Sequence, residues 1–444
     1  MDSNSEVPQR NALFGKRLLI VGRGDEAWGA RRNDYIVRAK ELGVEVVILG
    51  NESSPAASGI ESVLAVDTAD YSACHHAVQR YLGHERLDGI LTFLEERTET
   101  AARLNRDFGF NGHSVWGTEA CRNKNTMRTI LKEKGLPVPR FVHLNNREEA
   151  REVASWFPTP AFLKPAHGSG SVATRRVEAP EDIVATFDDV VQEIEERVVP
   201  EFVSIVLESY SESHANLILE EYLAPAERLN EVGLGRVGVE LLVQGGNIVF
   251  FAMADGQCFS PTDHRYATLT FPSRLSENDE RQFRRLADDI VSVFELSDGP
   301  VILDAVMTDS GPQLYEINAR IDGPGILPLV QTCYGVDLVE EALKIAVGLP
   351  VTLSASETAR ASAHLHMFLA ASRSRISKLE FPDSPRIEGC SAKMLKELGE
   401  IVQGPEANYD TIATLMLTAS TRDEVDSRLE QFLSQVTIEL EQLD

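Results

Sequence analysis

A lysine followed by a glycine- and serine-rich stretch is the first feature of this sequence with chemical potential. Lys164 ends a short apolar run, and Gly168, Ser169, Gly170 and Ser171 follow shortly after it. Glycines let backbone N–H groups turn toward a phosphate oxygen, and the lysine adds a positive charge. The lysine precedes the glycines, so this is not a Walker A loop. The pattern is consistent with a phosphate-binding loop, but taken alone it favours the alternative, a flexible hairpin tip beside a surface lysine.

A second feature is a set of polar residues at every other position near residue 318, namely Glu316, Asn318 and Arg320. Alternate residues of a strand share one face, so we expect these three to point together. The residues between them are expected on the opposite side: Tyr315, Ile317 and Ala319. A carboxylate, an amide oxygen and a guanidinium suit Mg²⁺ together with a phosphate. The alternative is the solvated outer face of an edge strand.

A lone carboxylate in an apolar run strengthens the metal interpretation. Asp304 lies within residues 301–306, and the turn at 309–312 predicts a hairpin that brings it beside Glu316. A buried carboxylate is costly unless it is paired or bound to a metal, and two adjacent carboxylates repel each other. A divalent ion between them removes the repulsion. The alternative is a salt bridge to a lysine or arginine.

The elements that must position these residues follow from hydrophobic patterning. In the first part of the chain, strands are predicted at residues 17–21, 44–49 and 87–93. Helices are predicted at about 28–42 and through Ala101, Ala102 and Leu104. This alternation of strands and helices is typical of a parallel α/β sheet. Asn123 to Lys134 is predicted as an amphipathic helix that carries Lys124 and is capped by Gly135. Further strands are predicted at 161–163, 217–220, 237–243, 247–252, 301–307 and 313–317. Helices are predicted at 181–196 and from Arg422 to about Leu440.

Composition limits the possible partners. The formal net charge of -26 repels nucleic acid phosphates and acidic membranes, so we expect neither partner. No run approaches the ~20 apolar residues of a membrane helix. The polar, acidic start does not resemble a secretory signal. Five widely spaced cysteines without a CxxC pair favour free thiols, and we expect a cytoplasmic protein.

The order of the chemical segments is Lys124 on a helix, Lys164 before the glycine loop, Glu220 to Leu223 at a strand end, Asp304, and Glu316-x-Asn318-x-Arg320. Over residues 17–350 this order resembles the ATP-grasp superfamily, and more narrowly its carboxylate–amine ligases, which include the L-amino acid ligases that make dipeptides. The resemblance implies an α/β fold in three parts. These are a Rossmann-like parallel-sheet domain at 1–115, an antiparallel-sheet ATP-grasp domain at 116–350 with a lid at about 138–222, and a small α/β domain at 351–444.

The resemblance also implies roles for individual residues. Those expected to bind ATP are Lys124, Lys164, Gly168, Ser169, Gly170, Ser171, Glu220, Glu221, Tyr222, Leu223 and Glu240. The lysines would contact the phosphates, residues 168–171 would fold over them, residues 220–223 would meet adenine through the backbone, and Glu240 would hold the ribose. Asp304, Glu316 and Asn318 would bind Mg²⁺ or Mn²⁺. Arg320 would be the catalytic residue that steadies an acyl phosphate.

Two positions depart from the family pattern. The first metal ligand is usually Glu in this family, whereas Asp304 is one methylene shorter. Arg236 stands where an acidic residue is often found, and the connection over residues 224–235 is longer than usual. Arg236 and the longer connection bear on how the ribose is held.

The implied function is ATP-dependent joining of a carboxylate, with amino acids as the first candidates, to an amine through an acyl phosphate. A homodimer is one expectation for the assembly, because homodimers are common among such ligases. An alternative within the fold is a biotin-carboxylase-like enzyme that phosphorylates bicarbonate. A second is an NAD(P)-dependent oxidoreductase, suggested by Gly22-x-Gly24 and Glu52, but Gly29 arrives too late for a GxGxxG fingerprint.

Overall fold

The computed structural model describes residues 11–22, 33–50, 62–168, 173–196, 215–230, 233–260, 265–323, 325–351, 353, 358–382, 387–404 and 410–443. Three members of the predicted glycine loop, Ser169, Gly170 and Ser171, lie outside the described residues, as do Gly24, Gly29 and Glu52.

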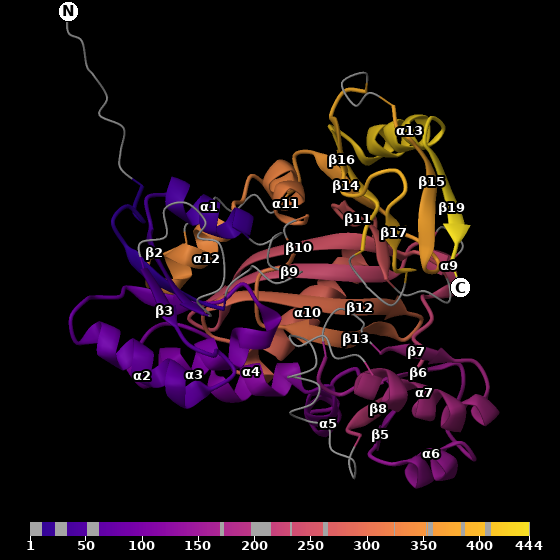
Figure 1. Ribbon diagram of the computed structural model, residues 1–444, viewed down its shortest axis with the longest axis horizontal. Helices are drawn as coiled ribbons and strands as arrows, with labels where there is room; N and C mark the ends of the chain where they lie inside the picture. The colour runs from indigo at the N-terminus through magenta and orange to yellow at the C-terminus, as the bar shows by residue number, and fades with distance from the viewer. Residues whose placement is uncertain are drawn as a thin grey trace, which may run out of the picture.

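A four-stranded parallel sheet forms the first part of the chain (Figure 1, indigo and purple). Its order is β3 (Ser62–Ala65), β2 (Glu45–Gly50), β1 (Arg17–Val21) and β4 (Gly89–Leu91). It is accompanied by α1 (Asn33–Glu41), α2 (Tyr71–Leu82), η1 (Glu95–Arg97) and α3 (Thr98–Phe108). Leu18 and Ile20 of β1 enter one core, and Leu19 and Val21 enter another. The sheet is therefore buried on both faces, as the continuous apolar strands predict.

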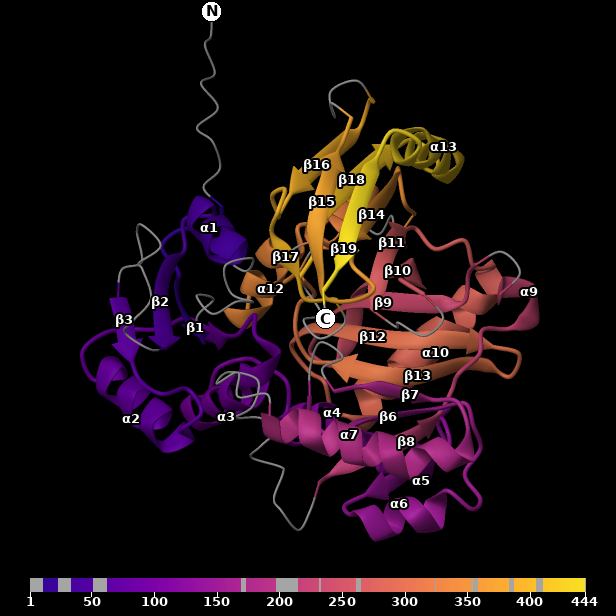
Figure 2. The same ribbon diagram turned by 45° about the vertical axis from the view of Figure 1, so that its right-hand side comes forward.

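The centre of the molecule is an eight-stranded sheet with antiparallel pairing (Figures 1 and 2). Its order is β13 (Gly311–Asn318), β12 (Gly299–Thr308), β9 (Arg236–Gln244), β10 (Asn247–Cys258), β11 (Tyr266–Phe271), β14 (Ser362–Phe368), β18 (Ala413–Ala419) and β16 (Cys390–Met394). Helix α10 (Glu277–Val293) covers one face, where Val239, Leu241 and Leu303 join its apolar residues in one core. Near its β9–β13 edge, the other face carries the predicted site.

A smaller antiparallel sheet lies below the central one in Figure 2. It is built of β5 (Phe141–Leu144), β8 (Leu217–Glu221), β6 (Ala161–Pro165) and β7 (Arg175–Val177), and α6 (Arg147–Val153), η2 (Pro180–Asp182) and α7 (Ile183–Glu196) accompany it. Helices α4 (Val115–Arg122) and α5 (Lys124–Glu133) connect it to the parallel sheet. The side chain of Asn123 accepts hydrogen bonds from two backbone N–H groups at the start of α5. This cap fixes where the helix begins, and hence where Lys124 lies.

The C-terminal region corrects one prediction. The helix expected from Arg422 to about Leu440 ends at Leu433 (α13, Arg422–Leu433), and Thr437–Gln442 forms strand β19. Strand β19 pairs with β15 (Ser374–Glu380), which also pairs with β17 (Ile401–Val402). The alternation of Thr437-Ile438-Glu439-Leu440 has the period of a strand, and pairing with β15 satisfies its backbone.

Three strands beyond residue 350, β14, β16 and β18, extend the central sheet. The sheet therefore continues across the predicted domain limit, and the limits themselves stay predictions. The remaining helices are α9 (Glu227–Asn230), α11 (Leu327–Tyr334) and α12 (Leu338–Ala346). Within the described part of the chain, every helix is too short or too polar to cross a membrane.

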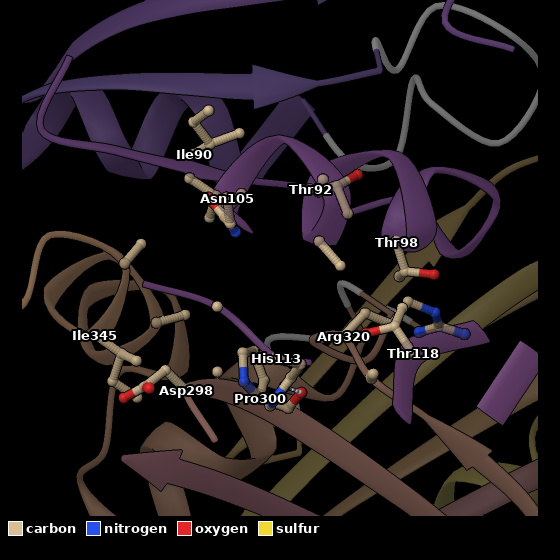
Figure 3. Close-up of a pocket in the computed structure, with 18 of the residues that line it drawn as sticks. Ile90, Thr92, Thr98, Asn105, His113, Thr118, Asp298, Pro300, Arg320 and Ile345 are labelled. Carbon is tan, nitrogen blue, oxygen red and sulfur yellow. Dashed lines mark hydrogen bonds between the residues drawn. The ribbon is translucent and has the colours of Figure 1, made fainter. Parts of the chain in front are cut away.

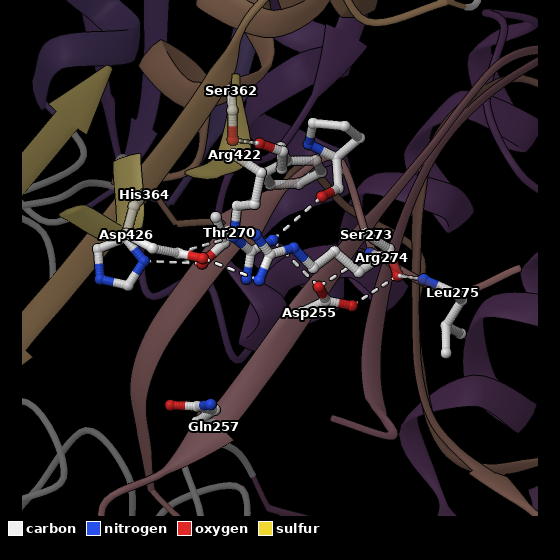
Figure 4. A network of polar contacts seen from close by, with 12 residues as sticks. Asp255, Gln257, Thr270, Ser273, Arg274, Leu275, Ser362, His364, Arg422 and Asp426 are labelled. Carbon is white, nitrogen blue, oxygen red and sulfur yellow. Dashed lines mark hydrogen bonds and ion pairs between the residues drawn. The ribbon is translucent and has the colours of Figure 1, made fainter. Parts of the chain in front are cut away.

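A buried carboxylate fastens α13 to the central sheet (Figure 4). Asp255 of β10 is 2% exposed and accepts hydrogen bonds from the Ser273 hydroxyl at 2.5 Å and the Arg274 backbone N–H at 3.0 Å. The guanidinium of Arg422, at the first position of α13, lies 3.1 Å from the same carboxylate. Charge and hydrogen bonds thus connect three segments that are distant in sequence.

Replacing Asp255 by alanine is expected to lower the free energy of unfolding by about 3–5 kcal/mol, because it leaves the Arg422 cation without this buried partner. Chemical denaturation followed by circular dichroism measures the change. Asp423→Ala is the control, since this carboxylate is 94% exposed in its ion pair with Arg274 and should cost less than about 1 kcal/mol. Equal losses in the two variants would contradict the role given to Asp255.

Candidate active site

Two carboxylates stand side by side on neighbouring strands, as the predicted hairpin requires. Asp304 of β12 is paired directly with Glu316 of β13. Burial raises the pKa of Asp304 well above its ordinary value, and the nearby carboxylates of Glu316 and Asp322 raise it further. The Glu316 carboxylate lies 3.0 Å from the ammonium of Lys124. Among the described residues, the Lys124 ammonium therefore neutralises only part of the negative charge that Asp304 and Glu316 can carry together.

A β-bulge corrects the predicted orientation of Tyr315. The register between β12 and β13 shifts after Asp304, so that Ala305 pairs with Leu314 and Tyr315 has no pairing partner. Leu314 and Ile317 enter the core beneath α10, whereas the Tyr315 hydroxyl meets that of Tyr266. Tyr315 was expected opposite Glu316, but the extra residue of the bulge turns it to the same side. The Tyr266 hydroxyl also reaches Asp304, at 3.5 Å.

Two more of the predicted site residues, Asn318 and Glu240, lie level with Ile302, two residues along β12 from Asp304. Asn318 and Glu240 flank Ile302 from the two adjacent strands, and they are 6% and 4% exposed. Burial raises the pKa of Glu240 well above its ordinary value, and Asp322 and Asp304 add to the effect, while Arg320 opposes it. Sequence reasoning did not identify Asp322. The one available signal was its position two residues after Arg320.

The two predicted phosphate lysines approach from other elements. Lys164 of β6 lies 2.7 Å from Glu220 of β8, and the fully buried Arg128 of α5 lies 2.8 Å from the same carboxylate. Burial alone would raise the pKa of Glu220, but Arg128 and Lys164 outweigh it and lower the pKa to about 2. The Lys124 ammonium also donates to the Gly168 carbonyl at 3.1 Å. The described start of the predicted loop is therefore beside both Lys124 and Glu316.

Backbone hydrogen bonds fix the segment predicted to meet adenine. The backbone N–H of Glu221 donates to the carbonyl oxygen of Arg140 at 2.9 Å, and the backbone N–H of Tyr222 donates to the carbonyl oxygen of Pro160 at 3.0 Å. The Tyr222 ring lies beneath the Arg176 guanidinium, 4.6 Å from its centroid. Leu223 follows directly, beyond the end of β8. The segment thus leaves the smaller sheet in a fixed direction toward the central one.

The guanidinium of Arg320 forms an ion pair with Glu95, which lies in the N-terminal region that contains the parallel sheet. This guanidinium donates to Glu95 at 2.9 Å and to the Ile321 carbonyl at 2.9 Å, and Arg122 forms a second ion pair with Glu95. Burial alone would raise the pKa of Glu95, but Arg122, Arg320 and Lys124 lower it to about 2. Sequence reasoning missed the contacts of Arg122 and Arg128, because nothing in a helical pattern marks a buried arginine.

A small cavity lies beside Arg320, where β4 and α3 meet the start of β12 (Figure 3). Its volume is about 60 Å³, and its lining includes Asn105, His113, Thr118 and Ile345. The Pro300 carbonyl can only accept, so Nε2 of His113 carries the proton in their 3.1 Å contact. Burial lowers the pKa of His113 and keeps its ring neutral. The space suits a few water molecules rather than an amino acid.

The donor set fits a divalent cation of the Mg²⁺ type. Asp304, Glu316 and Asn318 offer hard oxygen atoms on one face, and a cation would relieve the repulsion that raises the pKa of Asp304. No cluster of three or more His, Cys, Asp or Glu side chains suited to a metal occurs among the described residues. Further ligands would therefore come from phosphate oxygens and water.

Two family models match the chain, namely the ATP-grasp N-terminal domain over residues 36–112 and the ATP-grasp domain over residues 121–324. Together they cover more than half of the sequence, and the chain belongs to the ATP-grasp family. This assignment agrees with the predicted resemblance and favours it over the oxidoreductase alternative.

The chain is similar in sequence to amino acid ligases and carnosine synthases, and similar in fold to a solved amino acid ligase. The L-arginine-specific L-amino acid ligase of Bacillus subtilis is 24% identical over 287 residues, which are 63% of each chain. Carnosine synthase 1 of Mus musculus is 22% identical over 367 residues, which are 79% of this chain and 42% of that protein. The crystal structure of an L-amino acid ligase from Bacillus licheniformis superposes with a TM-score of 0.74 at 15% identity, covering 97% of this chain and 100% of that one. The chain thus spans about two fifths to two thirds of these two curated relatives, and the solved structure shows the shared fold.

Glu95→Gln tests the link between Arg320 and the first part of the chain. The pKa of Glu95 is lower in the folded protein than its ordinary value of 4.5, so its stabilising effect is present above that pH and is lost as the pH falls toward 2. We expect the variant to be less stable by about 3 kcal/mol at pH 6, and the difference to shrink toward pH 2.5.

Urea denaturation at several pH values measures this difference, with Glu133→Gln at the exposed end of α5 as the matched control. A gap between Glu95→Gln and the wild type that stays constant with pH would show that the prediction is wrong.

Proposed function

We propose that this chain is an ATP-dependent ligase that converts a carboxylate into an acyl phosphate and transfers the acyl group to an amine, releasing ADP and phosphate. The observation that carries the proposal is the Asp304–Glu316 pair, with Lys124 in contact with it on the same site. Membership of the ATP-grasp family supports it.

The arrangement of cations supports a site for a polyphosphate. Lys124 and Lys164 enter from separate elements, and each holds a carboxylate, Glu316 and Glu220 respectively. Burial lowers the pKa of Lys164, with its neighbouring cations adding to the effect and Glu220 opposing it. An incoming phosphate chain would offer both ammonium groups additional negative partners. The two ammonium groups would then offset part of the negative charge that the nucleotide brings into the site.

Two displacements account for the reaction. An oxygen of the substrate carboxylate attacks the γ-phosphorus of ATP, and the bond to the ADP oxygen breaks. The amine nitrogen then attacks the acyl carbon, the carbon–oxygen bond to phosphate breaks, and a proton leaves the nitrogen. Phosphate is a far better leaving group than oxide, which is why activation is needed. Positioning and charge neutralisation dominate such transfers.

Individual residues would contribute mainly through charge. Arg320 is held by Glu95 and by the Ile321 carbonyl, so its guanidinium is oriented before substrate arrives. It would stabilise charge on the acyl phosphate. Asp304, Glu316 and Asn318 would hold Mg²⁺, which when bound supplies neutralisation of the β- and γ-phosphate oxygens. Lys124 and Lys164 would hold the phosphate chain in line for attack.

Amino acids are the proposed substrates on both sides of the new bond. This finer statement rests on the names of the relatives, an L-arginine-specific L-amino acid ligase and carnosine synthases. We place the protein in the cytoplasm, where ATP and amino acids are abundant. We expect small-molecule substrates as its ligands and a homodimer as one form of its assembly.

The test is phosphate release from ATP and Mg²⁺ across a panel of carboxylic acids that includes the common amino acids, each with and without hydroxylamine. We expect one class of acid to give a hydroxamate, which reports an acyl phosphate and identifies the donor. Phosphate release with bicarbonate alone would establish the carboxylase alternative. No release with any acid would contradict the ligase proposal.

Glu316→Gln should lower the rate of ADP formation by about 100-fold or more, because it removes one of the paired carboxylates while preserving the shape of the side chain. A coupled assay for ADP measures the loss, and circular dichroism verifies the fold. Glu277→Gln, a 95% exposed carboxylate at the start of α10, is the matched control. ADP formation within twofold of wild type in Glu316→Gln would exclude a metal-binding role for this residue.

A further inference from the structure

Arg236 occupies a position on the candidate site to which no role has been given. It is the first residue of β9, and it lies on the same face as Gly238 and Glu240. Arg236 is paired with Val306, and Gly238 is paired with Asp304. Two residues of a strand span about 7 Å, so Arg236 lies one step along the sheet from the carboxylate pair. Glu240, which the resemblance assigns to the ribose, lies one step in the opposite direction, toward Arg320, and in the proposal below it does not contact the sugar.

The surroundings of Arg236 are unusual for an arginine. The side chains that influence its charge are Tyr222, Tyr266, Tyr315 and Cys258. Gly256, directly across the β9–β10 ladder, makes room for the Tyr266 ring, which would collide with a Cβ atom there at 2.3 Å. Among the residues that the structure describes, neither an ion pair nor a hydrogen bond engages the guanidinium.

An unpaired guanidinium in a largely enclosed position is costly, because arginine keeps its charge at every ordinary pH. The other arginines of the site differ in this respect. Arg122 and Arg320 share Glu95, and Arg128 holds Glu220. Phenol groups and a thiol cannot neutralise the charge of Arg236. The negative partner is therefore expected to arrive with a ligand.

The position of Arg236 in the site indicates which part of a ligand would supply this negative partner. Tyr222 belongs to the segment predicted to meet adenine, and Asp304 and Glu316 form the predicted phosphate and metal end. Arg236 lies near Tyr222 and one step from Asp304. It would thus face the portion of ATP between the base and the γ-phosphate, which consists of the ribose and the α-phosphate. The acyl group belongs at the other end, beside Arg320.

We propose that Arg236 binds the α-phosphate of ATP and determines how the enzyme recognises the ribose. This inference rests on the proposed function, because it needs ATP in the site. A guanidinium donates hydrogen bonds to phosphate or ribose oxygens but cannot accept one from a ribose hydroxyl. An acidic residue would do the reverse, accepting from the hydroxyls and repelling the α-phosphate. The enzyme therefore holds its nucleotide through phosphate charge, and it tolerates the loss of the 2′-hydroxyl.

Calorimetric titration of the full chain with ADP and with 2′-deoxyADP, in the presence of Mg²⁺, tests the proposal. The wild type should bind the two nucleotides with Kd values within about threefold of each other, since no hydrogen bond to the 2′-hydroxyl is lost. Arg236→Met should weaken ADP binding about 10- to 100-fold. Arg236→Glu should bind weakly but prefer ADP over 2′-deoxyADP by about tenfold, because its carboxylate can accept from the hydroxyl.

Arg281→Met, a change of the same kind at an exposed position of α10, is the matched control and should bind ADP as the wild type does. Thermal unfolding without nucleotide gives an independent measurement. Arg236→Met should be at least as stable as the wild type, because the substitution removes an unpaired charge. A clear loss of stability would assign Arg236 a structural role and overturn the proposal.

The binding data separate the remaining outcomes. Wild-type protein that does not bind ADP would overturn the proposed function, and this inference with it. Binding of ADP that is the same in wild type and Arg236→Met would overturn the inference alone. A wild-type preference for ADP of about tenfold or more would show that the 2′-hydroxyl is recognised, and would overturn the proposed basis of sugar selectivity.

Discussion

Repulsion among carboxylates on one face of the central sheet is the constraint around which this molecule is built. Asp304, Glu316, Glu240 and Asp322 lie close enough to influence one another, and burial removes the water that would screen them. Such a cluster raises the free energy of the folded chain. It is tolerated because cations supplied by other elements offset part of the charge, and those cations include the lysines that we propose to hold the triphosphate.

Each compensating cation comes from a different part of the chain, so the charge balance also fixes how the parts meet. Lys124 extends from α5 to Glu316, while Arg128 of the same helix holds Glu220 in the smaller sheet. Arg128 donates in addition to the Tyr315 carbonyl at 2.5 Å, which connects α5 to the bulged strand. Arg320, at the end of the central sheet, holds Glu95 of the first part. Three units are thus joined at one site by ionic contacts, and the architecture depends on residues that we also propose to bind ATP.

The sequence predicted the local elements well and the long-range contacts poorly, for a physical reason. Asn123 and Gly135 mark the limits of α5 through capping chemistry that acts over a few residues. The hairpin of Asp304 and Glu316 follows from one turn. The bulge at Tyr315 leaves no comparable sign, because it arises from pairing with β12 and not from the local pattern. Glu95 and Arg128 find partners 225 and 92 residues away, and only the folded chain brings them together. The end of α13 was misjudged because strand β19 becomes favourable only where β15 is available to pair with it.

The departures from the family pattern lie together in the structure. Asp304 is shorter than the usual glutamate, and the Tyr266 hydroxyl, whose ring crosses Gly256, reaches it beside the bulged Tyr315. The long connection before β9 contains α9, whose Leu229 packs into the core beneath α10. That connection ends at Arg236, against the same tyrosines. A shorter carboxylate, an aromatic wall and an additional cation thus lie together at the end of the site where we propose that the nucleotide binds. Asn318 and Arg320, which we propose for metal binding and acyl transfer, lie toward the other end, where Glu95 holds Arg320.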